Sequence, residues 1–199
     1  MKTQSKWILG IVGAIVLIAI IAIFSYMSIY NGLVSSDETV KQAFGDVQSS
    51  YQRRLDLIPN LVSTVQGAAK FEAGTLEEVT KLRAQAVSAQ QTFASSNDVA
   101  AKQEAASSAE SALSRLLVIV ENYPDLKATQ NFADLQVQLE GTENRINVAR
   151  NNYNGAVQAY NTKVRSFPAN IVAGMGGFSV AKTFEASANA ASAPVVAFP

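Results

Sequence analysis

The stretch FADLQVQLEGTENRINVARNNYNGAVQAYNTKVRSF, residues 132–167, decides the fold class. Large apolar or aromatic residues recur along it at seven-residue intervals, and smaller apolar residues fill companion positions. The large residues are Phe132, Leu139, Ile146, Tyr153, Tyr160 and Phe167, and the companions are Leu135, Ala149 and Ala156. A seam sustained over more than four heptads predicts one long helix, ended by Pro168, that packs nearly antiparallel to neighbouring helices in a bundle.

The segment YQRRLDLIPNLV, residues 51–62, places a proline within another amphipathic helix. Apolar residues recur at helical spacing from Val40 to Ala69, and Pro59 does not disturb their phase. We therefore expect one helix that continues through Pro59 with a bend. The bend is either curvature that follows the bundle or a recognition site, and Arg54 beside the apolar face can reach a carboxylate. The residues of a recognition site at the bend are Arg53, Arg54, Pro59 and Asn60.

Two further helices are predicted between these long ones. Thr75 and Glu78 have the spacing of a capping box, which predicts a helix over about 75–94. Asp98 and the polar residues before it provide caps for a third helix, and Pro124 stops it. The body of the protein is therefore expected to be a bundle of about four long helices.

The stretch WILGIVGAIVLIAIIAIF, residues 7–24, contains no charged or strongly polar side chain. At a rise of ~1.5 Å per residue, its 18 residues span about 27 Å, close to the roughly 30 Å core of a bilayer. We predict a transmembrane anchor over 7–30, with Trp7, Tyr26 and Tyr30 in the headgroup regions. A cleaved signal peptide is the alternative, but its apolar core is usually only about 7–15 residues long and is followed by a small-x-small site that SYMSIYNG lacks.

Composition excludes several classes of function. Sixteen basic residues balance sixteen acidic ones, so the chain lacks the basic surface expected of a nucleic-acid-binding protein. The sequence contains no cysteine and no histidine, which removes the thiolate nucleophile, the imidazole base and the usual ligands of zinc, haem and iron–sulfur clusters. We expect no cofactor, no metal site and no enzymatic activity.

The last helix is unusually rich in asparagine. TENRINVARNNYNGAVQAYN, residues 142–161, holds six asparagines, and the pair Tyr-Asn repeats one heptad apart. In one interpretation the tyrosine rings are buried while hydroxyl groups and amides form hydrogen bonds between helices. In the other, a polar ladder fixes the helix register or contacts a partner. The residues of this ladder are Glu143, Arg150, Tyr153, Asn154, Tyr160 and Asn161.

Residues 169–199 form an Ala/Ser/Gly-rich tail with two charged residues. GMGGF, residues 174–178, lacks the Lys-Ser/Thr of a phosphate-binding loop and follows no predicted strand, so we interpret it as a flexible turn. Phe178 and Phe184 are candidates to dock on the bundle. The extreme tail is expected to be loose.

These segments closely resemble the LemA family of bacterial membrane proteins. The resemblance extends from YNGLV (30–34) through residues 52–72 and 121–168 to Gly177-Phe178 and covers about three quarters of the chain; the tail beyond Phe184 lies outside it. It implies a single-pass anchor and, over 31–168, a soluble domain of long antiparallel helices. It carries over no catalytic residues.

The expected protein is all-α, with an N-terminal transmembrane helix followed by an antiparallel bundle. Lys2 and Lys6 place residues 1–6 in the cytoplasm under the positive-inside rule, so the main domain is expected outside the cytoplasmic (inner) membrane. The leading hypothesis for its function is a structural or adaptor protein of the cell envelope. Its expected partners are the lipid bilayer and either another membrane or envelope protein or a second copy of the chain.

Three alternative functions are weighed against the adaptor. An extracytoplasmic sensor would have to signal through a membrane partner, because only about six residues precede Trp7. An enzyme could use paired carboxylates such as Glu140 and Glu143, but these are better explained as solvated or paired with Arg145 and Arg150. Membrane remodelling by the bundle helices is disfavoured because their polar faces lack an excess of Lys and Arg.

Overall fold

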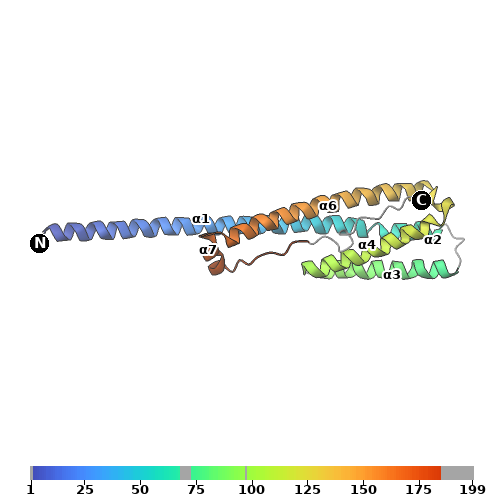
Figure 1. The fold of residues 1–199 in the computed structure, drawn as a ribbon, viewed down its shortest axis with the longest axis horizontal. Coiled ribbons are helices and arrows are strands. Elements are labelled where there is room, and N and C mark those ends of the chain that lie inside the picture. The colour runs from blue at the N-terminus through green and yellow to red at the C-terminus, as the bar shows by residue number, and fades with distance from the viewer. Residues whose placement is uncertain (1, 68–72, 97, 185–199) are drawn as a thin grey trace, which may run out of the picture. The chain divides into compact units, whose positions relative to one another are not determined.

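The computed structural model describes residues 2–67, 73–96 and 98–184, and these residues confirm the all-α fold class. They form helices and connecting segments without a strand (Figure 1). In chain order the helices are α1 (Lys2–Leu55), α2 (Ile58–Gly67), α3 (Ala73–Ser95), α4 (Val99–Glu121), α5 (Pro124–Lys127), α6 (Gln130–Arg165) and α7 (Ala169–Gly176). Contacts divide the chain into unit 1, within residues 1–42 and 155–181, and unit 2, within residues 43–154 and 182–199. Helices α1 and α6 each contribute to both units.

Unit 2 is built around a large apolar core. Helices α3 and α4 form a hairpin and lie side by side along their length (Figure 1). Val79 of α3, Leu116 of α4 and Ile146 of α6 are among its fully buried side chains. The bundle is therefore held mainly by aliphatic stripes of the kind the sequence predicts.

The helix that contains Pro59 is interrupted, so the predicted single bent helix is wrong. Helix α1 ends at Leu55, two turn residues follow, and α2 begins at Ile58. Pro59 thereby lies in the first turn of α2, where its missing N–H has no intrahelical partner to lose. Leu55, Ile58 and Val62 are nevertheless all buried, because the apolar stripe keeps its phase across the break.

The two middle helices begin differently from each other. Thr75 lies inside α3, which already includes Ala73, so the predicted capping box is not at the start of that helix. Asp98 does cap α4 as expected, and its carboxylate accepts a hydrogen bond from the Ala100 N–H at 3.2 Å. Pro124 follows the end of α4 and opens α5, as its fixed φ favours.

The seam of α6 is confirmed along most of its length. Five of the six predicted large residues are buried, namely Phe132, Leu139, Ile146, Tyr153 and Tyr160. The prediction that Phe167 belongs to the buried seam is wrong, because α6 ends at Arg165 and the Phe167 side chain is 81% exposed. Val157, which the heptad pattern omits, is fully buried while Ala156 is only half-buried. A helix period of 3.6 drifts away from a strict seven-residue repeat, which explains this exchange.

Unit 1 has a small core where the sequence predicts a flexible turn. GMGGF is instead the end of α7, and Gly177 caps the helix with a φ of 76°. The N–H groups of Gly177 and Phe178 both donate to the Ala173 carbonyl, which reverses the chain. Val172 and Ala173 of α7 bury against Leu33 of α1, and the partly buried residues packed around them are Ile29, Val164 and Phe178.

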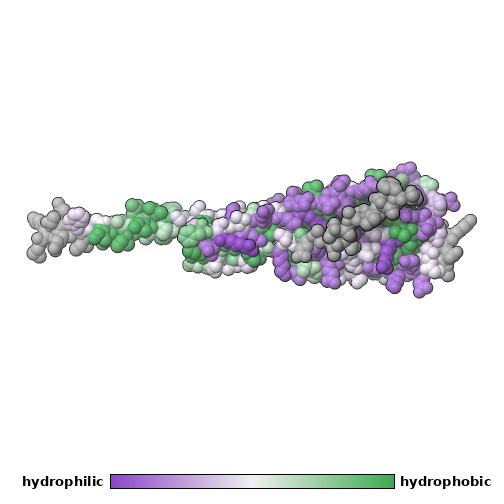
Figure 2. All heavy atoms as spheres, viewed as in Figure 1, coloured by the Kyte–Doolittle hydropathy of each residue, from purple (hydrophilic) through white to green (hydrophobic). Residues whose placement is uncertain are grey.

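The N-terminal part of α1 is long and apolar enough to cross a membrane, and its most apolar window is not buried within the structure. Figure 2 shows this part of the helix as a predominantly hydrophobic surface. Trp7 is 74% exposed, as expected of a side chain available to lipid. The predictions that concern the extreme tail, Asn97 and the segment 68–72 lie outside the described residues.

Candidate interaction site on α1 and α6

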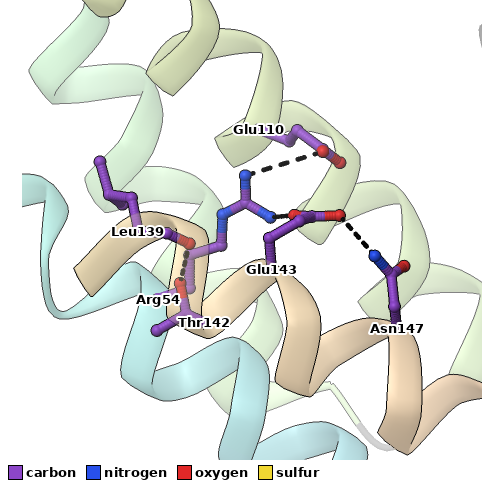
Figure 3. A network of polar contacts seen from close by, with 6 residues as sticks. All are labelled: Arg54, Glu110, Leu139, Thr142, Glu143 and Asn147. Carbon is purple, nitrogen blue, oxygen red and sulfur yellow. Dashed lines mark hydrogen bonds and ion pairs between the residues drawn. The ribbon is translucent and has the colours of Figure 1, made fainter. Parts of the chain in front are cut away.

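Arg54 of α1 occupies the centre of a polar network in unit 2 (Figure 3). Its Nη1 donates to Glu143 of α6, and its Nη2 lies 3.8 Å from an Oε of Glu110 on α4. The other carboxylate oxygen of Glu143 accepts from Asn147 at 3.2 Å. Arg54 therefore reaches carboxylates as predicted, and it ties α1 to both α4 and α6.

This network includes an ion pair that the sequence did not name. Glu143 was expected to be solvated or to pair with Arg145 or Arg150, and it pairs with Arg54 of α1. The Arg54 side chain is only 15% exposed, and its Nε is buried with no hydrogen-bond partner. Because both carboxylates remain about half exposed to water, the network fixes the relative position of three helices more than it adds stability.

A polar cavity of about 370 Å³ adjoins this network. Arg54, Glu110 and Glu143 contribute to its wall, together with Arg150 and Tyr51. Burial raises the pKa of the Tyr51 hydroxyl, and the neighbouring Glu110 carboxylate acts in the same direction. The cavity thus combines positive, negative and aromatic groups without a dominant charge.

Asn154 of α6 binds the backbone of the C-terminal segment rather than another helix. Its amide nitrogen donates to the Phe184 carbonyl at 3.0 Å, and its amide oxygen accepts from the Phe184 N–H at 2.9 Å. The neighbouring Tyr153 hydroxyl donates to the Lys182 carbonyl at 2.8 Å. Both polar groups of one residue in an extended chain are thereby satisfied by a single side chain.

Asn161 repeats the same two-bond arrangement within unit 1. Its amide nitrogen donates to the Ala181 carbonyl at 2.9 Å, and its amide oxygen accepts from the Ala181 N–H at 2.8 Å. Seven residues of helix rise ~10.5 Å, while three residues of extended chain span ~10 Å. This match explains why asparagines one heptad apart on α6 bind backbone groups three residues apart.

The side chain of Phe184 is anchored in an aromatic cluster of unit 2. Its ring lies 5.3 Å from the ring of Tyr153 and 6.2 Å from that of Phe44, and Tyr51 is also in contact. Phe184 is buried, so the prediction that it docks on the bundle is confirmed. Tyr160 contributes a buried ring in unit 1, where burial raises the pKa of its hydroxyl.

An open groove of about 410 Å³ lies between α1 and α6 in unit 2. Its lining includes the short side chains Ser49, Ser50 and Ala149, together with Val148, which is 59% exposed. Arg53 and Arg145 also line the groove, and the ion pairs among the described residues involve neither of them. The other polar side chains of its lining are Asp46, Thr142, Asn144 and Asn152.

The remaining predicted residues are not among those that line this groove. Pro59 and Asn60 are exposed in the first turn of α2. Tyr26 and Tyr30 stack at 6.2 Å between ring centroids in unit 1, and the Tyr30 ring meets the edge of Phe178 at 5.5 Å. Their placement at the membrane interface stays a prediction. Within the described part of the chain, no group of three or more metal-ligating side chains comes together.

Comparison with known proteins identifies the family. The LemA family model matches residues 43–198. The chain belongs to the LemA family. The family match begins after residue 42 and extends through the Ala-rich tail, so the expectation that the tail lies outside the family pattern is wrong.

Three relatives of this LemA family member are similar over most of its length. Magnetosome proteins MamQ 2 and MamQ 1 of Paramagnetospirillum magneticum are each 25% identical over 199 residues, which cover 88% of this chain and 73% of the relative. Protein LemA of Metamycoplasma hominis is 25% identical over 150 residues, which cover 75% of this chain and 66% of the relative. The family and the apolar N-terminal helix together indicate a membrane-associated protein.

Sequence reasoning found the asparagines of α6 but missed what they bind. The Tyr-Asn repeat was a visible signal, whereas the segment 181–184 carries no apolar periodicity that would reveal an extended chain packed on a helix. The groove was missed for another reason. Ser49, Ser50 and Ala149 come from two helices far apart in sequence, and only their packing brings them together.

Proposed function

We propose that this protein is a membrane-anchored adaptor of the bacterial cell envelope. Its helical bundle binds another envelope protein through the groove between α1 and α6. The observation that carries this proposal is the groove itself, with an exposed valine and two arginines outside any ion pair of the described residues. A non-enzymatic role agrees with a sequence that lacks cysteine and histidine.

The lining of the groove fits an amphipathic helix of the partner. Small side chains at Ser49, Ser50 and Ala149 allow a helix to approach closely, and Val148 offers an apolar contact. Arg53 and Arg145 complement carboxylates beside that apolar contact, because guanidinium groups bind carboxylates in a two-bond geometry. The partner segment is thus expected to be helical, with acidic residues next to its apolar stripe.

Site-specific photocrosslinking in intact membranes tests the groove. A crosslinking residue at Val148 is expected to capture a protein other than the chain itself. Val137 provides the matched control, because it is a valine of the same helix, is 69% exposed, and is absent from the lining of the groove. Equal capture at both positions would remove the support for a specific groove.

Charge reversal then tests the arginines. The double variant Arg53→Glu, Arg145→Glu is expected to abolish capture at Val148 while leaving the thermal midpoint nearly unchanged, since both side chains are exposed. Arg115→Glu, an exposed arginine of α4, is the control and is expected to retain capture. Retained capture in the double variant would contradict the proposed acidic partner.

The orientation of the anchor is part of the same proposal. The lysines that precede the apolar stretch support a cytoplasmic N-terminus and a bundle outside the cytoplasmic membrane. A C-terminal reporter that is active only outside the cytoplasm is expected to be active, and one active only inside is expected to be silent. The reverse result would place the adaptor's partner in the cytosol.

The polar cavity beside Arg54 favours one alternative, an extracytoplasmic sensor. Its volume of about 370 Å³ suits a small polar ligand, and its walls include Tyr51 and Arg54 of the helix that also contains the anchor. A sensor would have to signal through a membrane partner. It predicts that a small polar metabolite raises the melting temperature of the full chain in detergent and that Arg150→Ala, at the cavity wall, removes this effect.

A further inference from the structure

The segment that contains α7 is free of charge. Between Arg165 and Lys182 the sequence holds no acidic or basic residue. Helix α7 occupies Ala169–Gly176 within this segment. The apolar side chains of a short helix without a charged face need other groups to cover them from water.

One face of α7 packs on α1 where the anchor ends. Val172 and Ala173 bury against Leu33, and Ile29 is packed against the same cluster. Gly176 lies so close to Tyr30 that an added Cβ would come within 3.2 Å of the tyrosine ring. These contacts, all within unit 1, fix α7 at the last turn of the predicted membrane span. Figure 1 shows α7 running across the direction of α1.

The opposite face of α7 is apolar and exposed. Ile171 is 55% exposed and Met175 is 73% exposed, and they are four residues apart, so they lie on one side of the helix. Phe167, in the turn that precedes α7, is 81% exposed. Large exposed apolar side chains on and next to a helix beside a membrane span indicate contact with an apolar phase.

We propose that α7 is a second membrane-binding element, which lies in the interface between headgroups and acyl chains and inserts Phe167, Ile171 and Met175 into the bilayer. Continuity with the anchor selects lipid as the occupant, because the contacts of α7 are with the residues at which α1 leaves the bilayer. Helices that lie in this interface bury their apolar face about 5–10 Å deep. Since α7 carries no charge, its insertion is independent of anionic lipid.

The chain contains no cysteine, so single labels test this inference directly. The full chain is reconstituted in nanodiscs of zwitterionic phosphatidylcholine, with one chain per disc, and an environment-sensitive fluorophore is attached at Ile171→Cys or Met175→Cys. Phe24→Cys, within the anchor, is the positive control. Val137→Cys, at the other end of α6, is the negative control of comparable exposure.

Labels at 171 and 175 are expected to show blue-shifted emission, strong quenching by brominated lipid and severalfold weaker quenching by iodide than the label at 137. High salt is expected to leave these values unchanged. In the second variant, Ile171→Asp, iodide is expected to quench the label at 175 strongly. The anchor should keep the chain in the disc, and far-ultraviolet circular dichroism should be unchanged.

Two results would overturn the inference. Strong iodide quenching at 171 and 175, equal to that at 137, would place this face of α7 in water. Weak quenching by both iodide and brominated lipid would show that another part of the protein covers this face. Neither result depends on the groove between α1 and α6, so the adaptor proposal stands or falls separately.

Discussion

The two units differ in how many apolar side chains each buries within itself. Unit 2 has an extended core of aliphatic and aromatic side chains, to which the described residues of α1 to α6 all contribute. Unit 1 has a smaller core, in which Leu33, Val172 and Ala173 form a cluster and Val40, Val157 and Tyr160 are also buried. It exposes large apolar side chains along both α1 and α7. We therefore expect unit 2 to be the more stable of the two in water, because it buries more of its apolar side chains.

The largest expected effect comes from a core leucine of unit 2. Leu116→Ala removes a fully buried side chain and should lower the free energy of unfolding by about 3–5 kcal/mol. Leu76→Ala in the same unit is the control, because Leu76 is 46% exposed, and it should cost less than ~1 kcal/mol. Chemical denaturation measures both. Similar losses of unfolding free energy in the two variants would contradict the assignment of Leu116 to the core.

The same substitution in unit 1 sharpens the comparison. Leu33→Ala should release α7, with a local loss of about 2–3 kcal/mol, because the leucine is 1% exposed in a small core that can partly collapse. Hydrogen exchange is expected to accelerate in α7 while amides of α3 and α4 stay protected. Faster exchange throughout the chain would show that the two units unfold together.

Two asparagines of α6 allow the same contact, an amide side chain bound to the backbone of residues 181–184, to be compared in the two units. Asn154→Ala and Asn161→Ala each remove two hydrogen bonds to backbone groups, which should reduce protection of residues 181–184 by about 1–2 kcal/mol. The loss at Asn154 should be the smaller, because the buried Phe184 ring still holds its part of the segment, whereas Ala181 has no comparable aromatic side chain. Asn152→Ala, an exposed asparagine of the same helix, is the control for exchange at these amides.

The smallest effect concerns pH. Burial raises the pKa of the Tyr153 hydroxyl above its ordinary value, whereas the unfolded chain ionises this tyrosine near pH ~10. The native state then binds more protons than the unfolded state above that pH, so the contribution to stability is present below about pH 10 and is lost as the pH rises further.

Tyr153→Phe removes this titration and also the hydrogen bond to Lys182. The variant should be less stable than the parent at pH 7 by about 1 kcal/mol, and the gap should narrow above pH ~10. Melting temperatures between pH 7 and 11 measure the gap. A constant gap would mean that the hydroxyl titrates alike in the folded and unfolded chains.

The sequence by itself determined the helices, the apolar anchor-like segment and most of the core. These features depend on local properties, namely apolar spacing along Phe132–Tyr160, the cap at Asp98 and an uncharged stretch from Trp7 to Phe24. The same local signals failed at Pro59 and Phe167. A periodic stripe does not reveal a two-residue break in its helix, and a heptad pattern does not reveal where a helix ends.

Only the tertiary structure decided which surfaces meet. Arg54 reaches Glu143 across 89 positions of the sequence, and Asn154 meets Phe184 across 30. The groove and the position of α7 depend likewise on side chains brought together from separate helices. The sequence indicates that such a group will be paired but not which partner it meets, because a guanidinium or an amide group is suited to many partners and packing alone selects one.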